Sequence, residues 1–501
     1  MTSSTVTSST VTSSTVTSSG VAARPDETAV AHGARWITLA FVIVGLLNYG
    51  YALLLTRLLD VAAYSRFAAG QGLILWASTV ATVCVPWVLA QGLARARSEP
   101  ERQSVTRFAK LVSVASGVSA AALTGVIALR FAAPAAVLAL AISTFVIFLG
   151  TTTTGWLQGT DRMRGLAILY VAENVLKNGA GVLLVVVARL GDTGALAAFG
   201  IGALVMLARW PRTPRALGQA PADGQGRPDP RRTDRWRRDL WSRAARIAGA
   251  QSMVSLFVAL DVVLVAVLPG NRALAASYQA SATLARIPLF VAGAVATAFF
   301  PSLSRGESGG VLAARALRMY AAVTLPVAAI LITVPGHLLA LVFPAQYGAV
   351  AMLLKFTAVT GFGAGGISLV IAFFQAADDY SCLTWLLVGL VGYAADLIVG
   401  WLIDGVTGLA VGGAVGTVSA LLLTGYHLVQ SQGYGALSRV ALIEPVLAAA
   451  VLTVVRPHLY LWLAAALLIG LRAGIRFLRP GARHARGPRW VKPAVHAIGS
   501  K

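Results

Sequence analysis

Long apolar runs recur along the whole chain, and their length dictates what they can form. Runs of about twenty residues match the ~30 Å hydrocarbon layer of a bilayer at ~1.5 Å of helical rise per residue. No water satisfies the backbone there, so such runs must be helices. The short alternating segments of a membrane barrel are absent from the sequence. Charged residues make up only 12% of the chain, whereas soluble proteins carry about 25%. The sequence therefore predicts an all-α polytopic membrane protein.

We expect about fourteen transmembrane helices from the length of these runs. The turns inside 111–150 and inside 440–475 are very short, and each of these stretches is divided into two spans. The predicted spans are 36–56, 67–91, 111–129, 132–150, 166–188, 193–209, 247–268, 277–300, 319–335, 347–375, 382–402, 406–429, 440–455 and 459–475.

Lysine and arginine fall mainly on one side of this predicted membrane topology. With the N-terminus in the cytoplasm, 32 of the 41 basic residues lie in cytoplasmic segments, six lie in outer loops and three lie inside spans. Basic residues are retained on the cytoplasmic side of a membrane. The bias predicts a multi-pass protein of a bacterial cytoplasmic membrane with both termini cytoplasmic. It also accounts for the net charge of +22 as positive charge on cytoplasmic loops, so the expected partner is the lipid bilayer and not nucleic acid.

Composition shifts divide the chain into units. The N-terminal segment repeats TSSTV and predicts a disordered tail. The loop 210–246 is rich in Pro, Gly and Arg and separates six spans from eight. It is predicted either to link two helical lobes, lying on anionic lipid, or to be a solvated topogenic loop with no partner. The predicted units are the cytoplasmic tail 1–34, the N-lobe 35–209, the basic linker 210–246, the C-lobe 247–429, the last two spans 430–478 and a basic cytoplasmic tail 479–501.

Several chemistries lack their sequence signatures. There is no phosphate-binding G-x-x-x-x-G-K-[ST], no H-E-x-x-H and no His/Cys cluster, so we expect no metal and no cofactor. The outer loops are too short to form an extracytoplasmic catalytic domain. Asp378 and Asp379 fit a solvated turn better than a metal site, and Cys84 and Cys382 lie inside apolar runs as small core residues. These features favour transport over enzymatic activity.

Charged residues inside spans are functional candidates, because each costs about 2.5–3.5 kcal/mol at a span centre on insertion scales. Glu173 and Lys177 are four residues apart in the span 166–188, share a helix face and are predicted to form an ion pair. Asn174 and Asn178 widen this polar stripe. The stripe either lines a substrate cavity or only holds two helices together.

A second group of charges lies in the C-lobe. Asp261 and Arg286 lie on adjacent antiparallel spans at depths of ~10 and ~15 Å from their shared outer loop, so they are expected to approach each other. Lys355 enters from the outer side at a similar depth. Such a cluster suits an anionic head group, because the planar guanidinium donates two parallel hydrogen bonds to phosphate. The alternative is a neutralised Asp–Arg pair; Glu444 and Asp396 lie near span ends and carry little weight.

Glycines concentrate in the span 347–375, where residues 361–366 read GFGAGG. Glycines within a span permit either close packing against another helix or a bend of the helix.

Three stretches of the sequence resemble the polysaccharide/oligosaccharide flippases of the multidrug/oligosaccharidyl-lipid/polysaccharide exporter superfamily. The first, NYGYALLLTRLLDVAAYSRFAAG at 48–70, supplies Arg57, Leu59, Tyr64 and Phe67 of the family's Arg-x-Leu and Tyr-Gly-x-Phe pattern, with Ser65 in place of the usual Gly. The others are ASYQASATLARIPLFVAGAVATAFFPSLSR at 276–305 and LVFPAQYGAVAMLLK at 341–355.

The resemblance implies two six-helix lobes in a V around a central cavity, with two further helices at the end. It also implies alternating access that carries an undecaprenyl-pyrophosphate-linked oligosaccharide to the outer leaflet, with a glycan polymerase or glycosyltransferases as possible partners. By motif match it carries over Arg57 alone. The cavity candidates are Arg57, Glu173, Lys177, Asp261, Arg286 and Lys355. Two other functions stay open, namely a cation-coupled drug or metabolite exporter of the same superfamily and a non-transporting scaffold of a glycan-assembly complex.

Overall fold

The computed structural model describes residues 27–95, 99–160, 162–211, 230–304, 309–432 and 440–478. These residues form α-helices and one short 3-10 helix, and no strand occurs among them, so the predicted all-α fold is confirmed. The elements are α1 (Glu27–Leu58), α2 (Val61–Arg95), α3 (Glu99–Ala128), α4 (Pro134–Gly159), α5 (Met163–Val186), α6 (Gly191–Leu207), α7 (Pro230–Val267), α8 (Arg272–Leu284), α9 (Ile287–Ser304), α10 (Gly309–Thr333), α11 (Gly336–Val342), η1 (Ala345–Tyr347), α12 (Val350–Ala376), α13 (Cys382–Gln432), α14 (Val440–Val455) and α15 (Leu459–Leu478).

The predicted spans correspond to these helices. The stretch 111–150 divides into α3 and α4, and the stretch 440–475 divides into α14 and α15. Two predicted spans form the halves of α13, which reverses direction at Asp404 and Gly405. Gly405 has a φ of 51°, which a residue without a Cβ adopts at little cost. The halves then pack so closely that a Cβ on Gly412 would strike the carbonyl oxygen of Asp396.

Length, composition and exposure mark a multi-pass membrane protein. Among the described residues, eight helices are long and apolar enough to cross a membrane, and four shorter apolar helices accompany them. In α5 and α13 only 22% of the most apolar window is buried inside the protein. Large apolar side chains therefore cover the outside of the bundle, which is the arrangement expected against lipid rather than water.

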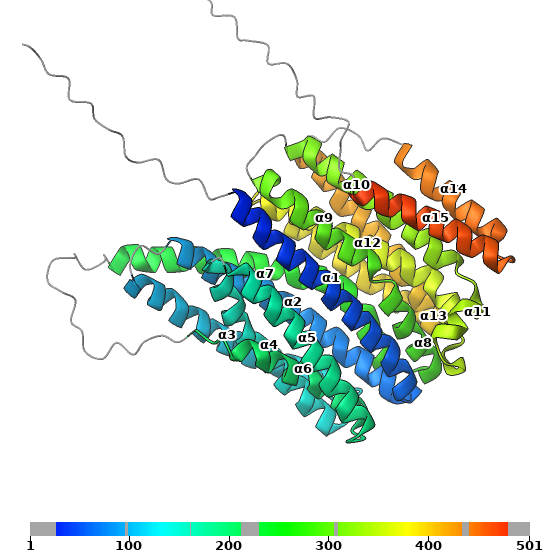
Figure 1. Cartoon of the computed structure of the whole chain (residues 1–501), viewed down its shortest axis with the longest axis horizontal. Coiled ribbons are helices and arrows are strands. Elements are labelled where there is room, and N and C mark those ends of the chain that lie inside the picture. The colour runs from blue at the N-terminus through cyan, green and yellow to red at the C-terminus, as the bar shows by residue number, and fades with distance from the viewer. Residues whose placement is uncertain are drawn as a thin grey trace, which may run out of the picture.

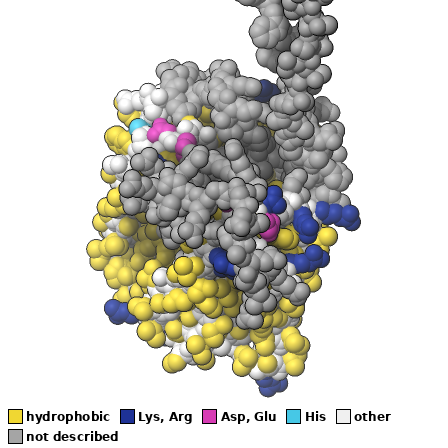
Figure 2. Space-filling model, turned by 90° about the vertical axis from the view of Figure 1, so that its left-hand side faces the viewer, with side chains coloured by type: hydrophobic (Ala, Val, Ile, Leu, Met, Phe, Trp, Pro, Cys, Tyr) yellow, Lys and Arg dark blue, Asp and Glu magenta, His cyan; other side chains and the backbone are white. Residues whose placement is uncertain are grey.

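Figure 1 shows two groups of helices that run side by side. The first bundle contains α1–α6, with α1 packed mainly on α5, and the second contains α8–α13, with α14 and α15 packed on α10. Helix α7 lies along α2 of the first bundle and also packs on α12 and α13 of the second. We call the end where α1 meets α2 the loop end and the opposite end, where α1 begins, the tail end. Figure 2 looks onto the tail end, where Lys and Arg side chains group on one side above a hydrophobic surface.

Three predicted polar segments extend partly or wholly beyond the described residues. Helix α1 begins at Glu27, inside the predicted tail 1–34, and α7 begins at Pro230, inside the predicted linker 210–246. Proline suits the first turn of a helix, where its missing N–H would have no partner. Residues 1–26, 212–229 and 479–501 lie outside the described part of the chain.

Candidate functional site

The predicted span 277–300 is a broken helix. Helix α8 ends at Leu284 and α9 begins at Ile287, so Arg286 lies in the break. The cause is Pro288, which has no N–H to donate to the carbonyl of Leu284 and whose ring disfavours a helical conformation of the preceding residue. The sequence thus places its most deeply embedded arginine where the backbone is interrupted.

A tyrosine of the first bundle fills this break. The Tyr49 hydroxyl on α1 donates to the carbonyl oxygen of Thr283 at 2.9 Å and lies 3.2 Å from that of Leu284. The Leu284 carbonyl is the acceptor that Pro288 cannot serve, and an unpaired buried carbonyl costs free energy. The Tyr49 ring also lies 6.1 Å from the ring of Phe290, measured between centroids. The two bundles are therefore joined by hydrogen bonds at the helix break.

The glycine-rich segment of α12 packs against the other side of the break. A Cβ on Gly361 would strike the carbonyl oxygen of Ala285, and a Cβ on Gly365 would lie 3.0 Å from that of Pro288. Helix α12 itself is continuous from Val350 to Ala376. Of the two predicted roles for GFGAGG, close packing is the one that the structure shows.

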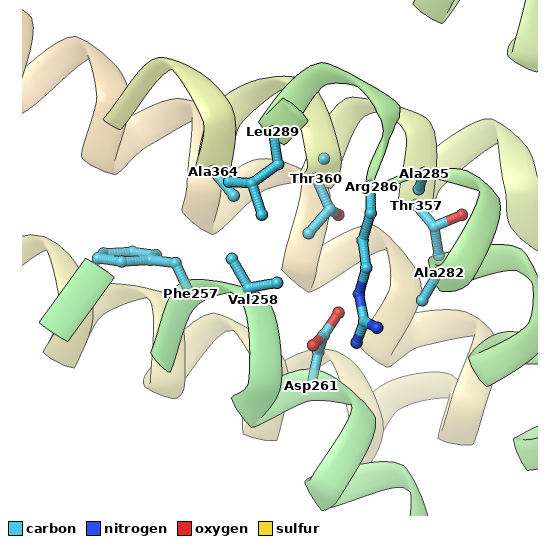
Figure 3. A pocket seen from close by; sticks show the side chains of 11 residues that line it. Phe257, Val258, Asp261, Ala282, Ala285, Arg286, Leu289, Thr357, Thr360 and Ala364 are labelled. Atoms are coloured by element: carbon cyan, nitrogen blue, oxygen red, sulfur yellow. The ribbon is translucent and has the colours of Figure 1, made fainter. Parts of the chain in front are cut away.

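A small cavity opens beside the break, between α7, α8, α9 and α12. Figure 3 shows the Arg286 guanidinium pointing toward the Asp261 carboxylate across it. Thr357 and Thr360 of α12 add hydroxyl groups. The full lining is Phe257, Val258, Asp261, Ala282, Ala285, Arg286, Leu289, Thr357, Thr360, Gly361 and Ala364.

The two charged groups of this cavity differ in their partners. Asp261 is buried; its Oδ2 accepts a hydrogen bond from the Tyr278 hydroxyl at 2.7 Å, and its Oδ1 accepts one from the backbone N–H of Val262 at 2.8 Å. No described residue forms a hydrogen bond or an ion pair within 4.0 Å with the Arg286 guanidinium. The structure brings Asp261 and Arg286 together, as their depths predicted, and leaves the arginine's donors free for a ligand.

Lys355 does not join them. It lies half-buried near the start of α12, and it is not among the residues that line the cavity. The three-charge cluster predicted from depth therefore reduces, in the described cavity, to one acid and one cation.

The predicted ion pair between Glu173 and Lys177 is wrong, because no salt bridge joins these described residues. The Lys177 ammonium instead donates to Asn48 Oδ1 on α1 and to Asn174 Oδ1 at 2.9 Å, and it lies 4.9 Å from the ring centroid of Phe199. Asparagine side chains and an aromatic face thus replace the carboxylate as its partners. A spacing of four residues permits a contact between two side chains of one helix, but it does not exclude a closer partner on another helix.

The rest of this polar stripe also faces α1. Asn178 Nδ2 donates to the carbonyl oxygen of Leu47 at 3.0 Å. Together with the bond from Lys177 to Asn48, this ties α5 to α1 within the first bundle. Of the two predicted roles for the stripe, these contacts favour the one that holds helices together.

Arg57 lies at the loop end of α1, outside the cavity. Its Nη2 donates to the carbonyl oxygen of Leu341 at 2.7 Å and lies 3.3 Å from that of Val342, at the end of α11. Nearby, the rings of Tyr64 and Tyr347 meet edge to face with centroids 5.5 Å apart. Both contacts run between the two bundles, so the loop end is closed.

Two features of the described residues were not predicted from the sequence. Arg66 and Asp192 form a two-pronged ion pair, with Nε to Oδ2 at 2.9 Å and Nη2 to Oδ1 at 3.1 Å, that fastens α2 to α6. Tyr49 was also missed as the partner of the helix break. Pro288 in an apolar span signals that carbonyls are left unpaired, but it does not identify the donor.

Comparison with known proteins finds solved structures of similar fold. No protein-family model matches the chain, and no curated protein matches it. Solved structures do. The lipid II flippase MurJ in an inward closed conformation superposes with a TM-score of 0.65 at 12% identity, covering 88% of this chain and 97% of that one. An inward-facing multidrug resistance MATE family transporter of the MOP superfamily gives 0.57 at 15% identity, covering 78% and 94%.

The chain shares the fold of these MurJ and MATE structures. A third structure, of MATE in the straight conformation, gives a TM-score of 0.57 at 16% identity over 81% of this chain and 96% of that one. At these identities the likeness establishes the fold and not the cargo. The predicted fold is confirmed, whereas membership of the superfamily and the narrower resemblance to polysaccharide flippases stay predictions.

Proposed function

We propose that this protein carries a lipid-linked glycan with an anionic head group from the cytoplasmic to the outer leaflet of a bacterial cytoplasmic membrane. The observation that carries the proposal is Arg286, an embedded guanidinium whose donors have no partner among the described residues. It lies at a helix break of the second bundle that Tyr49 of the first bundle contacts. An arginine inside a span is costly unless it has a role, and its planar fork matches the oxygens of a phosphate.

The physical requirement of such transport is to replace the hydration of a polar head. A sugar phosphate that entered the bilayer unaided would lose its hydrogen bonds to water. The guanidinium of Arg286 and the hydroxyls of Thr357 and Thr360 supply replacements, while the lipid tail remains in the bilayer. No covalent step is needed.

The contacts between the bundles support a mechanism of alternating access. The contacts made by Arg57, Tyr64 and Tyr49 close the loop end. With both termini cytoplasmic, as the distribution of basic residues predicts, the loop end is the outer side. Transport then requires these contacts to separate and new contacts to form at the tail end, so that the cavity changes sides.

The rival function is a cation-coupled drug or metabolite exporter, and the similarity to MATE structures is the observation in its favour. The two functions differ in what Arg286 must do. An anionic lipid cargo needs the cation, whereas a cationic drug would be repelled by it. A non-transporting scaffold would need neither charge, and contacts with a glycan polymerase or glycosyltransferases would then be its main activity.

Deletion of the gene in its native host tests the proposal. We expect a labelled lipid-linked glycan to accumulate on the cytoplasmic leaflet, and we expect complementation by wild-type protein but not by Arg286→Ala at equal membrane levels. Arg130→Ala, which changes an exposed arginine in the turn between α3 and α4, serves as the matched control. Normal export in the deletion strain, with no second transporter present, contradicts the flippase function.

A further inference from the structure

The cavity beside the helix break is poor in positive charge for a site that receives phosphate. Among the residues that line it, Arg286 is the one cation and Asp261 is the one acid. The described wall therefore offers one positive charge to an anion and already carries one negative charge of its own. The number of negative charges on the cargo must match what this wall can balance, because an unbalanced charge in a low-dielectric site is strongly unfavourable.

The other embedded or nearby cations of the described chain are placed elsewhere. The Lys177 ammonium is hydrogen-bonded to Asn48 and Asn174 inside the first bundle. Lys355 is not part of the cavity wall, and Arg57 donates to backbone carbonyls at the loop end. One guanidinium is what the described wall offers to an anion.

The carboxylate of Asp261 opposes the binding of a second anionic group in the cavity. Two hydrogen bonds, from Tyr278 and from the backbone of Val262, hold its carboxylate in place. Figure 3 shows this carboxylate facing the Arg286 side chain. Because the guanidinium points toward Asp261, a phosphate bound by the Arg286 fork would lie near this carboxylate. A second phosphate joined to the first would add a negative charge near Asp261, and the described wall has no second cation to balance it. Like charges placed together oppose binding.

We infer that the head group accepted here carries one phosphate, as in a polyprenyl-phosphate sugar, rather than the two of a polyprenyl-diphosphate sugar. The inference rests on the proposed function and departs from the diphosphate carrier that the sequence resemblance implies. A phosphodiester has a single negative charge shared by two free oxygens, which matches the two parallel donors of one guanidinium. A diphosphate esterified at both ends has two charges and leaves one of them unmatched.

A direct comparison of two lipids tests the inference. The full-length protein in nanodiscs is titrated with undecaprenyl-phosphate N-acetylglucosamine and with undecaprenyl-diphosphate N-acetylglucosamine, and Kd is measured by native mass spectrometry. We expect the monophosphate to bind about tenfold more tightly, equivalent to ~1.4 kcal/mol. Asp261→Asn removes the opposing charge and should tighten binding of the diphosphate until the preference is lost. Asp404→Asn, the same change at an exposed position of the loop end, should keep the wild-type preference.

The possible outcomes distinguish a failure of this inference from a failure of the proposed function. Equal binding of the two lipids by wild-type protein, or tighter binding of the diphosphate, overturns the inference and leaves the proposed function standing. Failure to bind either lipid contradicts the proposed function itself. A folded Asp261→Asn protein that keeps the full wild-type preference contradicts the role of Asp261. The wild-type comparison decides the main point even if Asp261→Asn does not fold.

Discussion

Tyr49 offers the sharpest perturbation of the closed loop end, because one hydroxyl links the two bundles at the helix break. Tyr49→Phe keeps the ring, and with it the contact to Phe290 at 6.1 Å. It removes the donor that lies 2.9 Å from the carbonyl of Thr283 and 3.2 Å from that of Leu284. The Leu284 carbonyl then has no helical partner, because residue 288 is proline, whereas the Thr283 carbonyl still accepts from the backbone N–H of Arg286 at 3.4 Å.

The size of the effect follows from the hydrogen bond lost. Leaving a buried acceptor without its partner costs about 1–3 kcal/mol. That cost applies to the state in which the bundles touch at the loop end and disappears when they separate and water reaches the carbonyls. The ratio of closed to open molecules should therefore fall roughly 5- to 150-fold. A minor open state in the wild-type protein would become readily detectable.

Distances between spin labels measure this population. Labels are attached at Arg130→Cys in the turn between α3 and α4 and at Gln346→Cys in η1, both exposed at the loop end and one in each bundle. The native cysteines are replaced beforehand. We expect pulsed electron–electron spectroscopy to show a longer-distance population in Tyr49→Phe and none in the control Tyr460→Phe, which changes an exposed tyrosine of α15. Identical distance distributions in all three proteins would refute the argument that the helix break holds the bundles together.

Three further substitutions test other contacts of the structure. Arg57→Ala should produce a smaller longer-distance population between the same spin labels than Tyr49→Phe does, because an exposed hydrogen bond contributes only about 0.5–1.5 kcal/mol. A larger population would contradict this ranking. Gly361→Ala should lower Tm in detergent by a cost of about 1–3 kcal/mol, since its Cβ would strike the carbonyl of Ala285, whereas Gly179→Ala has open space and should leave Tm unchanged. Lys177→Met should lower Tm while the membrane-inserted protein keeps its transport rate, because the hydrogen bonds of Lys177 hold helices together within one bundle. Loss of transport at normal stability would indicate that Lys177 contacts the cargo.

Much of this architecture could be predicted from the sequence, because a membrane span is recognised from the length and apolarity of its residues alone. The approach of Asp261 to Arg286 was also predictable, since rise per residue converts sequence position into depth on two adjacent helices. The prediction for Lys355 failed to place it at the cavity wall, because depth says nothing about which way a helix face is turned.

The contacts that could not be predicted join residues far apart in the sequence or involve backbone carbonyl groups. Lys177 takes Asn48, which lies 129 residues away on α1, and no local pattern connects them. Arg57 and Tyr49 both donate to backbone carbonyls, which every residue carries and which leave no mark in a sequence. The packing of α12 on the helix break could be anticipated from GFGAGG only as close approach, without its partner.

The central claim, that this protein moves a lipid-linked glycan between leaflets, is tested most directly with purified full-length protein in proteoliposomes. The vesicles contain undecaprenyl-phosphate N-acetylglucosamine or its diphosphate counterpart, and a membrane-impermeant galactosyltransferase added outside modifies only the sugar in the outer leaflet. We predict that wild-type protein makes nearly the whole lipid pool available for modification, while Arg286→Ala vesicles stop at the fraction that faced outward from the start. If wild-type and protein-free vesicles gave the same modified fraction with both lipids, the proposed transport would be contradicted.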